Sequence, residues 1–143
     1  MNINANTDYA YRVLLYLATH TEHRVTIAEI ANFFTISHEH LRKIIHCLSK
    51  AQYIQTYLGR NGGMALLKEP DMINLKDVFL TFESNQVIQC HTKGCTLMHH
   101  CTLQIIFNQA NIQFLEVLAN YSLADLINDK RMQESLSLPI EIR

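Results

Sequence analysis

Apolar residues recur every three or four positions in three successive segments near the start of the chain, and this spacing predicts three helices. The helices are expected within residues 7–20, 26–34 and 38–54, joined by short connections. A chain with this pattern must bury three apolar faces against one another, so we expect a helical core. The residues expected to face inward are Ala10, Val13, Leu14, Leu17, Ala18, Ile27, Ile30, Ala31, Phe34, Leu41, Ile44, Ile45 and Leu48.

The connection between the second and third segments predicts a helix-turn-helix. Thr26 and Glu29 have the spacing of a capping box at the start of the second helix. The letters TIS then interrupt the pattern, and Ser37 is a candidate N-cap of the third helix. In DNA-binding proteins with this motif, the second helix enters the major groove. Any pair of core helices can show the same pattern, so it does not establish DNA binding alone.

The stretch YIQTYLGRNGGMALL predicts a β-hairpin, because two alternating segments flank a glycine-rich turn at residues 60–63. Helix, helix-turn-helix and hairpin in this order indicate a winged helix, whose hairpin tip reaches the DNA backbone or the minor groove. A phosphate-binding loop is excluded, because neither Lys-Ser/Thr nor a helix follows the glycines. The residues expected to contact DNA are Ser37, His38, His40, Arg42, Lys43 and Arg60.

The distribution of charge agrees with contact between the first half and a polyanion. The net charge is only −1, but residues 1–68 carry seven Lys and Arg against four Asp and Glu, and five of the eight histidines. Residues 69–143 carry five Lys and Arg against nine Asp and Glu. The excess of positive charge is small, so it supports DNA contact only together with the winged-helix pattern.

The second half is predicted to supply a dimer contact. A short helix is expected in INLKDVFLTFE, with Val78, Phe79 and Phe82 packed inward, and a long helix is expected over residues 102–128. The long helix is apolar on more than one side, so it needs its own domain and a second partner, most simply a second copy of the chain. An ordinary core helix is the alternative. Its two apolar stripes are Phe107, Ala110, Phe114, Val117 and Tyr121, and Leu103, Ile106, Leu115 and Leu118.

Three of the four cysteines stand close together among histidines: Cys90, Cys95 and Cys101. No apolar stretch of membrane-spanning length and no leader is evident, so we expect the chain in the cytoplasm, where thiols stay reduced and a disulfide knot is disfavoured. Zinc prefers two closely spaced pairs, yet a histidine can complete a Cys3His set. Three thiolates can equally hold an iron–sulfur cluster that takes its fourth ligand elsewhere. The spacing leaves these two about equal, with coincidence third.

The fourth cysteine, Cys47, stands apart from the other three. It lies in the third predicted helix beside Ile44 and Leu48, so it is expected to be a small buried apolar residue.

The chain resembles the Rrf2 family of winged-helix transcription regulators over nearly its whole length. The likeness rests on four stretches: TDYAYRVLLYLA, SHEHLRKIIHCLSKAQYI, GRNGGMAL, and the triple cysteine before a helix ending in YSLADLI. Within the family, the chain is most similar to repressors that respond to nitric oxide. Members that regulate iron–sulfur assembly have a longer first cysteine gap and a histidine where this chain has Gln104.

The resemblance implies a four-iron four-sulfur cluster in a homodimer that is not an enzyme. It further implies repression of nitric-oxide detoxification genes at an AT-rich inverted repeat. Arg12, one turn after Asp8, is expected to pair with that carboxylate when no cluster is bound. A two-iron cluster is the alternative, because His99 and His100 precede the last cysteine. The implied cluster ligands are Cys90, Cys95, Cys101 and, from the partner subunit, Asp8.

The expected fold class is therefore mainly α, with five regions along the chain. They are a winged helix-turn-helix DNA-binding domain (1–68), a connecting helix (69–89), a cysteine loop (90–101), a dimerisation helix (102–128) and a poorly ordered tail (129–143).

Overall fold

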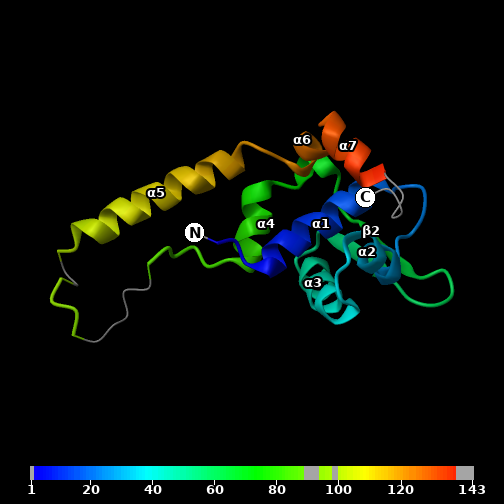
Figure 1. Cartoon of the computed structure of the whole chain (residues 1–143), viewed down its shortest axis with the longest axis horizontal. Coiled ribbons are helices and arrows are strands. Elements are labelled where there is room, and N and C mark those ends of the chain that lie inside the picture. The colour runs from blue at the N-terminus through cyan, green and yellow to red at the C-terminus, as the bar shows by residue number, and fades with distance from the viewer. Residues whose placement is uncertain (1, 89–93, 98–99, 138–143) are drawn as a thin grey trace.

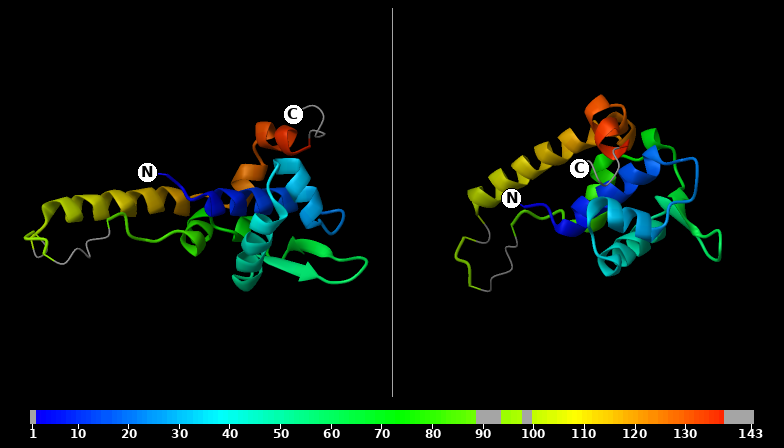
Figure 2. Two further views of the ribbon diagram at one scale, coloured as in Figure 1. Left: turned by 60° about the horizontal axis from the view of Figure 1, so that its bottom comes forward. Right: turned by 45° about the vertical axis from the view of Figure 1, so that its right-hand side comes forward.

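Three helices and a β-hairpin form one end of the molecule, which we call the head (Figure 1). The computed structural model describes residues 2–88, 94–97 and 100–137. The helices pack around α1, and the hairpin projects from the head on the side opposite the later helix α5 (Figure 2). The elements of the head are α1 (Ala5–Thr19), α2 (Ile27–Phe34), α3 (His38–Lys50), β1 (Ile54–Tyr57) and β2 (Gly63–Leu66).

The starts of α2 and α3 follow the expected capping chemistry. Thr26 and Glu29 form a reciprocal capping box, and the Ser37 side chain accepts a hydrogen bond from the backbone N–H of His40. The end of α2 was not expected: Thr35 ends the helix with φ 56° and ψ 49°, in the left-handed region. A β-branched residue is uncommon there, because its side chain crowds the backbone.

The core lies where α1 crosses α2 and α3, and the expected inward residues fill it. Ten of the thirteen are buried, whereas Ala18, Ile27 and Phe34 are partly buried and pack against the core. Thr7 is fully buried at the start of α1, although it is polar. The apolar spacing therefore predicts the interior of the head correctly.

The hairpin is antiparallel, with Ile54 opposite Leu66 and Tyr57 opposite Gly63. Its second strand also bonds to Val25, because Met64 and Val25 exchange backbone hydrogen bonds of 3.0 and 2.8 Å. Gly63 has φ 141°, and a Cβ there would lie only 2.8 Å from the Val25 oxygen. Glycine is needed at this position because the second strand approaches the backbone of Val25 so closely.

In the second half, helix α4 packs on the head and helix α5 projects from it as an arm (Figure 1). As expected, α4 buries Val78 and Phe79 and partly buries Phe82. Every helix in the described residues is too short or too polar to cross a membrane. The elements are the 3-10 turn η1 (Pro70–Met72), α4 (Leu75–Phe82), α5 (Thr102–Ala119), α6 (Leu123–Ile127) and α7 (Lys130–Ser137).

The long helix expected over residues 102–128 is two helices. Residues 120–122 interrupt it, since Tyr121 accepts a hydrogen bond from the N–H of Leu75 and Leu123 donates to the oxygen of Ile73. These bonds require extended backbone at Ser122, which then starts α6 with a capping box. Bonding to a distant segment thus ends the helix, and the apolar periodicity does not reveal this.

The tail expected to be poorly ordered from residue 129 contains a helix. Asp129 accepts a hydrogen bond of 3.0 Å from the N–H of Met132 and so begins α7. Leu136 in this helix is only 5% exposed and joins the core of the head. The remainder of the expected tail, residues 138–143, lies outside the described residues.

Candidate functional site

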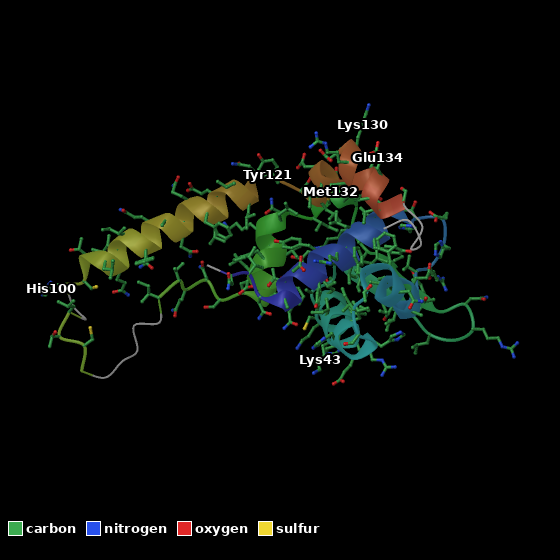
Figure 3. The ribbon with its side chains drawn as sticks, in the orientation of Figure 1. Lys43, His100, Tyr121, Lys130, Met132 and Glu134 are labelled. Atoms are coloured by element: carbon green, nitrogen blue, oxygen red, sulfur yellow. The ribbon has the colours of Figure 1, made fainter. Side chains whose placement is uncertain are left out.

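The outer face of α3 carries polar and basic side chains that are free of the core. Ser37, His38, His40, Arg42 and Lys43 are all exposed. Lys43 lies 3.7 Å from the carboxylate of Glu39, but both side chains are more than 70% exposed, so this pair holds Lys43 only weakly. Figure 3 shows Lys43 pointing away from the head on α3. The cationic face that the sequence predicts is therefore present and accessible.

The hairpin tip carries a second cation and is fastened to the head by Arg24, a residue that the sequence reading missed. Arg60 is exposed at the tip, next to Leu58, which is 98% exposed. The Arg24 guanidinium lies over the Tyr57 ring, 3.6 Å from its centroid, and Nη1 donates to the Asn61 oxygen over 3.1 Å. This contact holds the strand end and the turn together. The only sequence signal is an isolated arginine far from both partners.

Asp8 lies on α1 and forms an ion pair with Arg12. The carboxylate oxygen is 2.8 Å from Arg12 Nη2, and both side chains are a little under half exposed. The Arg12 guanidinium also lies 5.7 Å from the Phe34 ring on α2, and the Tyr9 ring lies 6.3 Å from the His40 ring on α3. Side chains in the first turns of α1 thus touch both helices of the helix-turn-helix.

Two of the three clustered cysteines fall in the described residues, at the free end of the arm (Figure 1). Cys95 is exposed, Cys101 is partly buried at the N-cap of α5, and both are free thiols. Figure 3 shows His100, the neighbour of Cys101, at this end of the molecule, away from α1. Within one chain, the described residues 94–97 and 100–101 of the cysteine loop therefore lie apart from Asp8.

The donor set suits a soft metal centre. Thiolate sulfur is a good ligand for iron–sulfur clusters and zinc, and both described thiols are accessible. Cys101 stands at the N-cap of the 18-residue helix α5. Among the described residues, no three His, Cys, Asp or Glu side chains gather into a metal-binding group. Cys90, His91 and His99 lie outside them.

Cys47 is exposed on α3, not buried as expected. The buried residues of this helix are Leu41, Ile44, Ile45 and Leu48. Cys47 precedes the buried Leu48 in sequence but lies outside the buried face of the helix, which is narrower than the spacing alone suggests.

Helix α5 keeps much of its apolar surface uncovered. Phe114 packs against Phe79 of α4, with ring centroids 5.2 Å apart, and Leu115 is buried. Six of the other apolar side chains of this helix are 40–58% exposed. A monomer seldom exposes so many large apolar groups on one helix. They are Leu103, Ile105, Ile106, Phe107, Ile112 and Val117.

The pKa values of His23 and Tyr11 are both raised, and each shift has a clear cause. The hydrogen bond that His23 donates to Glu29 raises the pKa of His23, whose Nε2 lies 2.7 Å from the Glu29 carboxylate. Burial raises the pKa of Tyr11, whose hydroxyl donates to the Leu75 oxygen over 2.6 Å. Tyr11 therefore ties α1 to the start of α4 as a neutral donor.

A three-helix head with a β-hairpin and an exposed basic second helix defines the class of winged helix-turn-helix transcription regulators, which are not enzymes. The family described as Rrf2, iron-dependent transcriptional regulator, matches residues 3–129. The chain belongs to the Rrf2 family.

Three similar curated relatives carry the same name. The chain is 39% identical to the HTH-type transcriptional regulator NsrR of Oceanobacillus iheyensis, with 96% of each chain covered. It is 40% identical to the NsrR of Geobacillus kaustophilus, over 95% of this chain and 96% of the relative. The NsrR of Bacillus licheniformis is 37% identical over 96% of this chain and all of the relative.

Solved structures agree with the fold. The chain superposes on IscR of T. potens with a TM-score of 0.74 and 23% identity, covering 90% of this chain and 88% of the other. The cysteine regulator CymR of B. subtilis gives a TM-score of 0.72 and 22% identity, covering 88% and 95%. At this identity the likeness concerns the fold alone.

Proposed function

We propose that the protein is a DNA-binding repressor that senses nitric oxide through an iron–sulfur cluster and controls nitric-oxide detoxification genes. Two lines of support agree. The sequence resembles the nitric-oxide-responsive branch of the family, which is NsrR, and the relatives reported above carry that name. The exposed basic face of α3 and the free thiols of Cys95 and Cys101 supply the groups that this function needs.

The recognition surface comprises two parts. On α3, the Arg42 guanidinium suits a guanine edge or a phosphate, and Lys43 suits a phosphate. At the hairpin tip, Arg60 suits a narrow, AT-rich minor groove, where the negative potential is strongest. Ser37, His38 and His40 complete the surface at the N-terminal end of α3, the end that usually meets base edges.

The active form is a homodimer joined through α5. The six exposed apolar side chains of this helix have no cover within the described chain, and the same helix of a second copy matches them by symmetry. A dimer also presents two recognition helices to two half-sites of an inverted repeat.

Cys90, Cys95 and Cys101 hold the cluster, with Asp8 of the partner subunit as fourth ligand. The bound cluster supplies an iron that is open to nitric oxide. A carboxylate oxygen is a harder and weaker ligand for this iron than thiolate. Asp8 is therefore the ligand that leaves most readily, and Arg12, 2.8 Å away, is placed to take it.

The observation that carries the proposal is the set of contacts made by the first turns of α1. Asp8 pairs with Arg12, Arg12 lies over Phe34 of α2, and the neighbouring Tyr9 lies beside His40 of α3. A change of partner at Asp8 thus alters packing against both helices of the DNA-reading unit. Small rotations of that unit suffice to lose an operator, because both half-sites must be met together.

The test is anaerobic purification followed by iron and sulfide assay and a visible spectrum. A duplex is selected from a randomised library by the iron-loaded dimer, and its affinity is measured before and after nitric oxide. We expect a coloured protein that binds tightly and releases the duplex when exposed to the gas. A colourless protein that contains zinc, or an iron protein whose DNA affinity is unchanged by nitric oxide, would contradict the proposal.

A further inference from the structure

One carboxylate oxygen of Glu83 accepts two hydrogen bonds from the first turn of α1. The backbone N–H of Asn4 and the hydroxyl of Thr7 each lie 2.6 Å from Glu83 Oε1. Glu83 directly follows the last residue of α4, and the chain continues from it into the cysteine loop. This side chain therefore joins the base of the loop to the helix that carries Asp8.

Helix α1 relies on this contact for the capping of its N-terminus. In a capping box, the side chain at the third helical position accepts the N–H of the N-cap residue. In α1 that position is Thr7, and the N–H of the N-cap Asn4 donates to Glu83 instead, 79 residues away. A carboxylate at this end is also favoured by the helix dipole.

Thr7 depends on the same oxygen. Its side chain is fully buried, and a buried hydroxyl without an acceptor is costly. Loss of the Glu83 carboxylate thus leaves the buried Thr7 hydroxyl without its acceptor and exposes the Asn4 N–H to water, in the turn that precedes Asp8. The expected consequence is fraying of that turn.

Few other contacts hold the base of the loop. Asn111 of α5 donates to both oxygens of Asn85, over 2.9 and 3.2 Å. Beside Glu83 lies a groove of about 190 Å³, and the apolar residues on its rim, Ile3 and Val87, are 51% and 39% exposed. Because apolar packing is sparse here, the hydrogen bonds to Glu83 set how the loop base meets α1.

We propose that Glu83 is a positioning residue that makes the base of the cysteine loop and the first turn of α1 move as one unit. The contact itself rests on the geometry above; its consequence rests on the proposed function. If Asp8 serves the partner subunit's cluster, then displacing one chain's loop displaces the Asp8 that the other chain's cluster uses. The two cluster sites of the dimer are then coupled through Glu83.

The contact is tested first in cluster-free protein by hydrogen exchange of the amides of residues 4–8 and 84–88. Thr7→Val removes the hydroxyl with little change of shape, and Thr7→Ser retains it as the matched control. We expect about tenfold faster exchange in both segments for Thr7→Val, as for loss of one buried hydrogen bond, and little change for Thr7→Ser. Equal exchange in the two variants would overturn the proposal.

Glu83 gives an independent pair of variants, which also serves if Thr7→Val fails to fold. Glu83→Ala removes the shared acceptor, whereas Glu83→Gln keeps an oxygen that accepts both bonds. Glu83→Ala is expected to speed exchange at least as much as Thr7→Val, because it removes both bonds, and Glu83→Gln is expected to lie near the wild type. If Glu83→Ala leaves both segments as protected as in the wild type, the contact has no positioning role.

The coupling is tested in iron-loaded dimers by titration with nitric oxide. We expect a Hill coefficient above 1 for the wild type and about 1 for Thr7→Val, with DNA release as the signal. Equal coefficients overturn the coupling. A wild type that binds no iron overturns the proposed function instead, and the hydrogen-exchange result then decides the Glu83 contact by itself.

Discussion

The guanidinium of Arg24 lies 3.6 Å from the centroid of the Tyr57 ring, and the same side chain donates to the backbone oxygen of Asn61. Tyr57 ends the first strand of the hairpin and Asn61 lies in its turn. A residue of the segment before α2 thus fixes the orientation of the hairpin tip that carries Arg60.

Replacing Arg24 by glutamine should loosen the hairpin without unfolding the head. The cation–π contact at this exposed site is worth about 0.5–1 kcal/mol, so the melting temperature should fall only by a few degrees. Affinity for the selected duplex should fall about 3- to 10-fold if the hairpin contacts DNA. Arg24→Lys keeps the charge but not the planar group, so its affinity for the duplex should lie between those of the wild type and Arg24→Gln. Affinity equal to the wild type in Arg24→Gln would count against a role for the hairpin in binding.

Serine in place of Cys95 or Cys101 should abolish iron binding, whereas Cys47→Ser should retain it. Cys47 is a matched control because it is also an exposed free thiol in the described residues. It stands on α3, away from the other two. Iron and sulfide content after anaerobic purification measures the effect. Retention of full iron content in Cys101→Ser would remove that residue from the ligand set.

Replacing Thr35 by asparagine should stabilise the head. Thr35 adopts φ 56° at the end of α2, a conformation that asparagine tolerates much better than a β-branched residue. The expected gain is about 0.5–1 kcal/mol in the free energy of unfolding, measured by urea denaturation. Thr35→Val, which keeps the branched side chain, should show no gain. A loss of stability in Thr35→Asn would mean that the hydroxyl makes a contact worth more than the strain.

Because of His23, the free energy of unfolding of the head should depend on pH above pH 6.5. The hydrogen bond donated to the Glu29 carboxylate raises the pKa of His23 above its ordinary 6.5, so the folded protein binds this proton more tightly than the unfolded chain does. The stabilisation is therefore complete below pH 6.5 and is lost as pH rises through the folded pKa. Glu29→Gln should lower the pKa of His23, as measured by NMR titration. Glu22→Gln should lower it less, because the contact of His23 with Glu22 is longer, at 3.4 Å.

Sequence patterns predicted the head well because its determinants are local. The spacing of Leu41, Ile44 and Leu48 defines one helix face, and the capping box at Thr26 uses residues three positions apart. The position of the hairpin followed from its glycines for the same reason. Such signals need no knowledge of what lies far away in the chain.

The features that escaped prediction depend on distant partners. The interruption of the long helix at Ser122 comes from bonding to residues 73–75, and the contact of Arg24 with Tyr57 spans two elements. Cys47 was misassigned because helix periodicity fixes the centre of a buried face better than its edge. The start of α7 is different: Asp129, placed before Met132, was a local capping signal that was not used.

Of the candidate site, the sequence supplied the donor types and their spacing. The exposure of the α3 cations and the Asp8–Arg12 ion pair agrees with expectation. Which groups meet in the metal site was beyond local reasoning, because the implied ligands come from α1 of one subunit and the loop of another.

The chain leaves the head at Leu75 and returns to it at Tyr121, and these two residues are hydrogen-bonded to each other. The segment between these two residues therefore begins and ends at the same place on the head. Insertions or deletions near Gly94, beyond the Glu83 contact with α1, can therefore be absorbed as long as the base of the loop stays in place. If the proposed function holds, a chain built this way can exchange one sensory chemistry for another over evolutionary time and keep its winged helix-turn-helix intact.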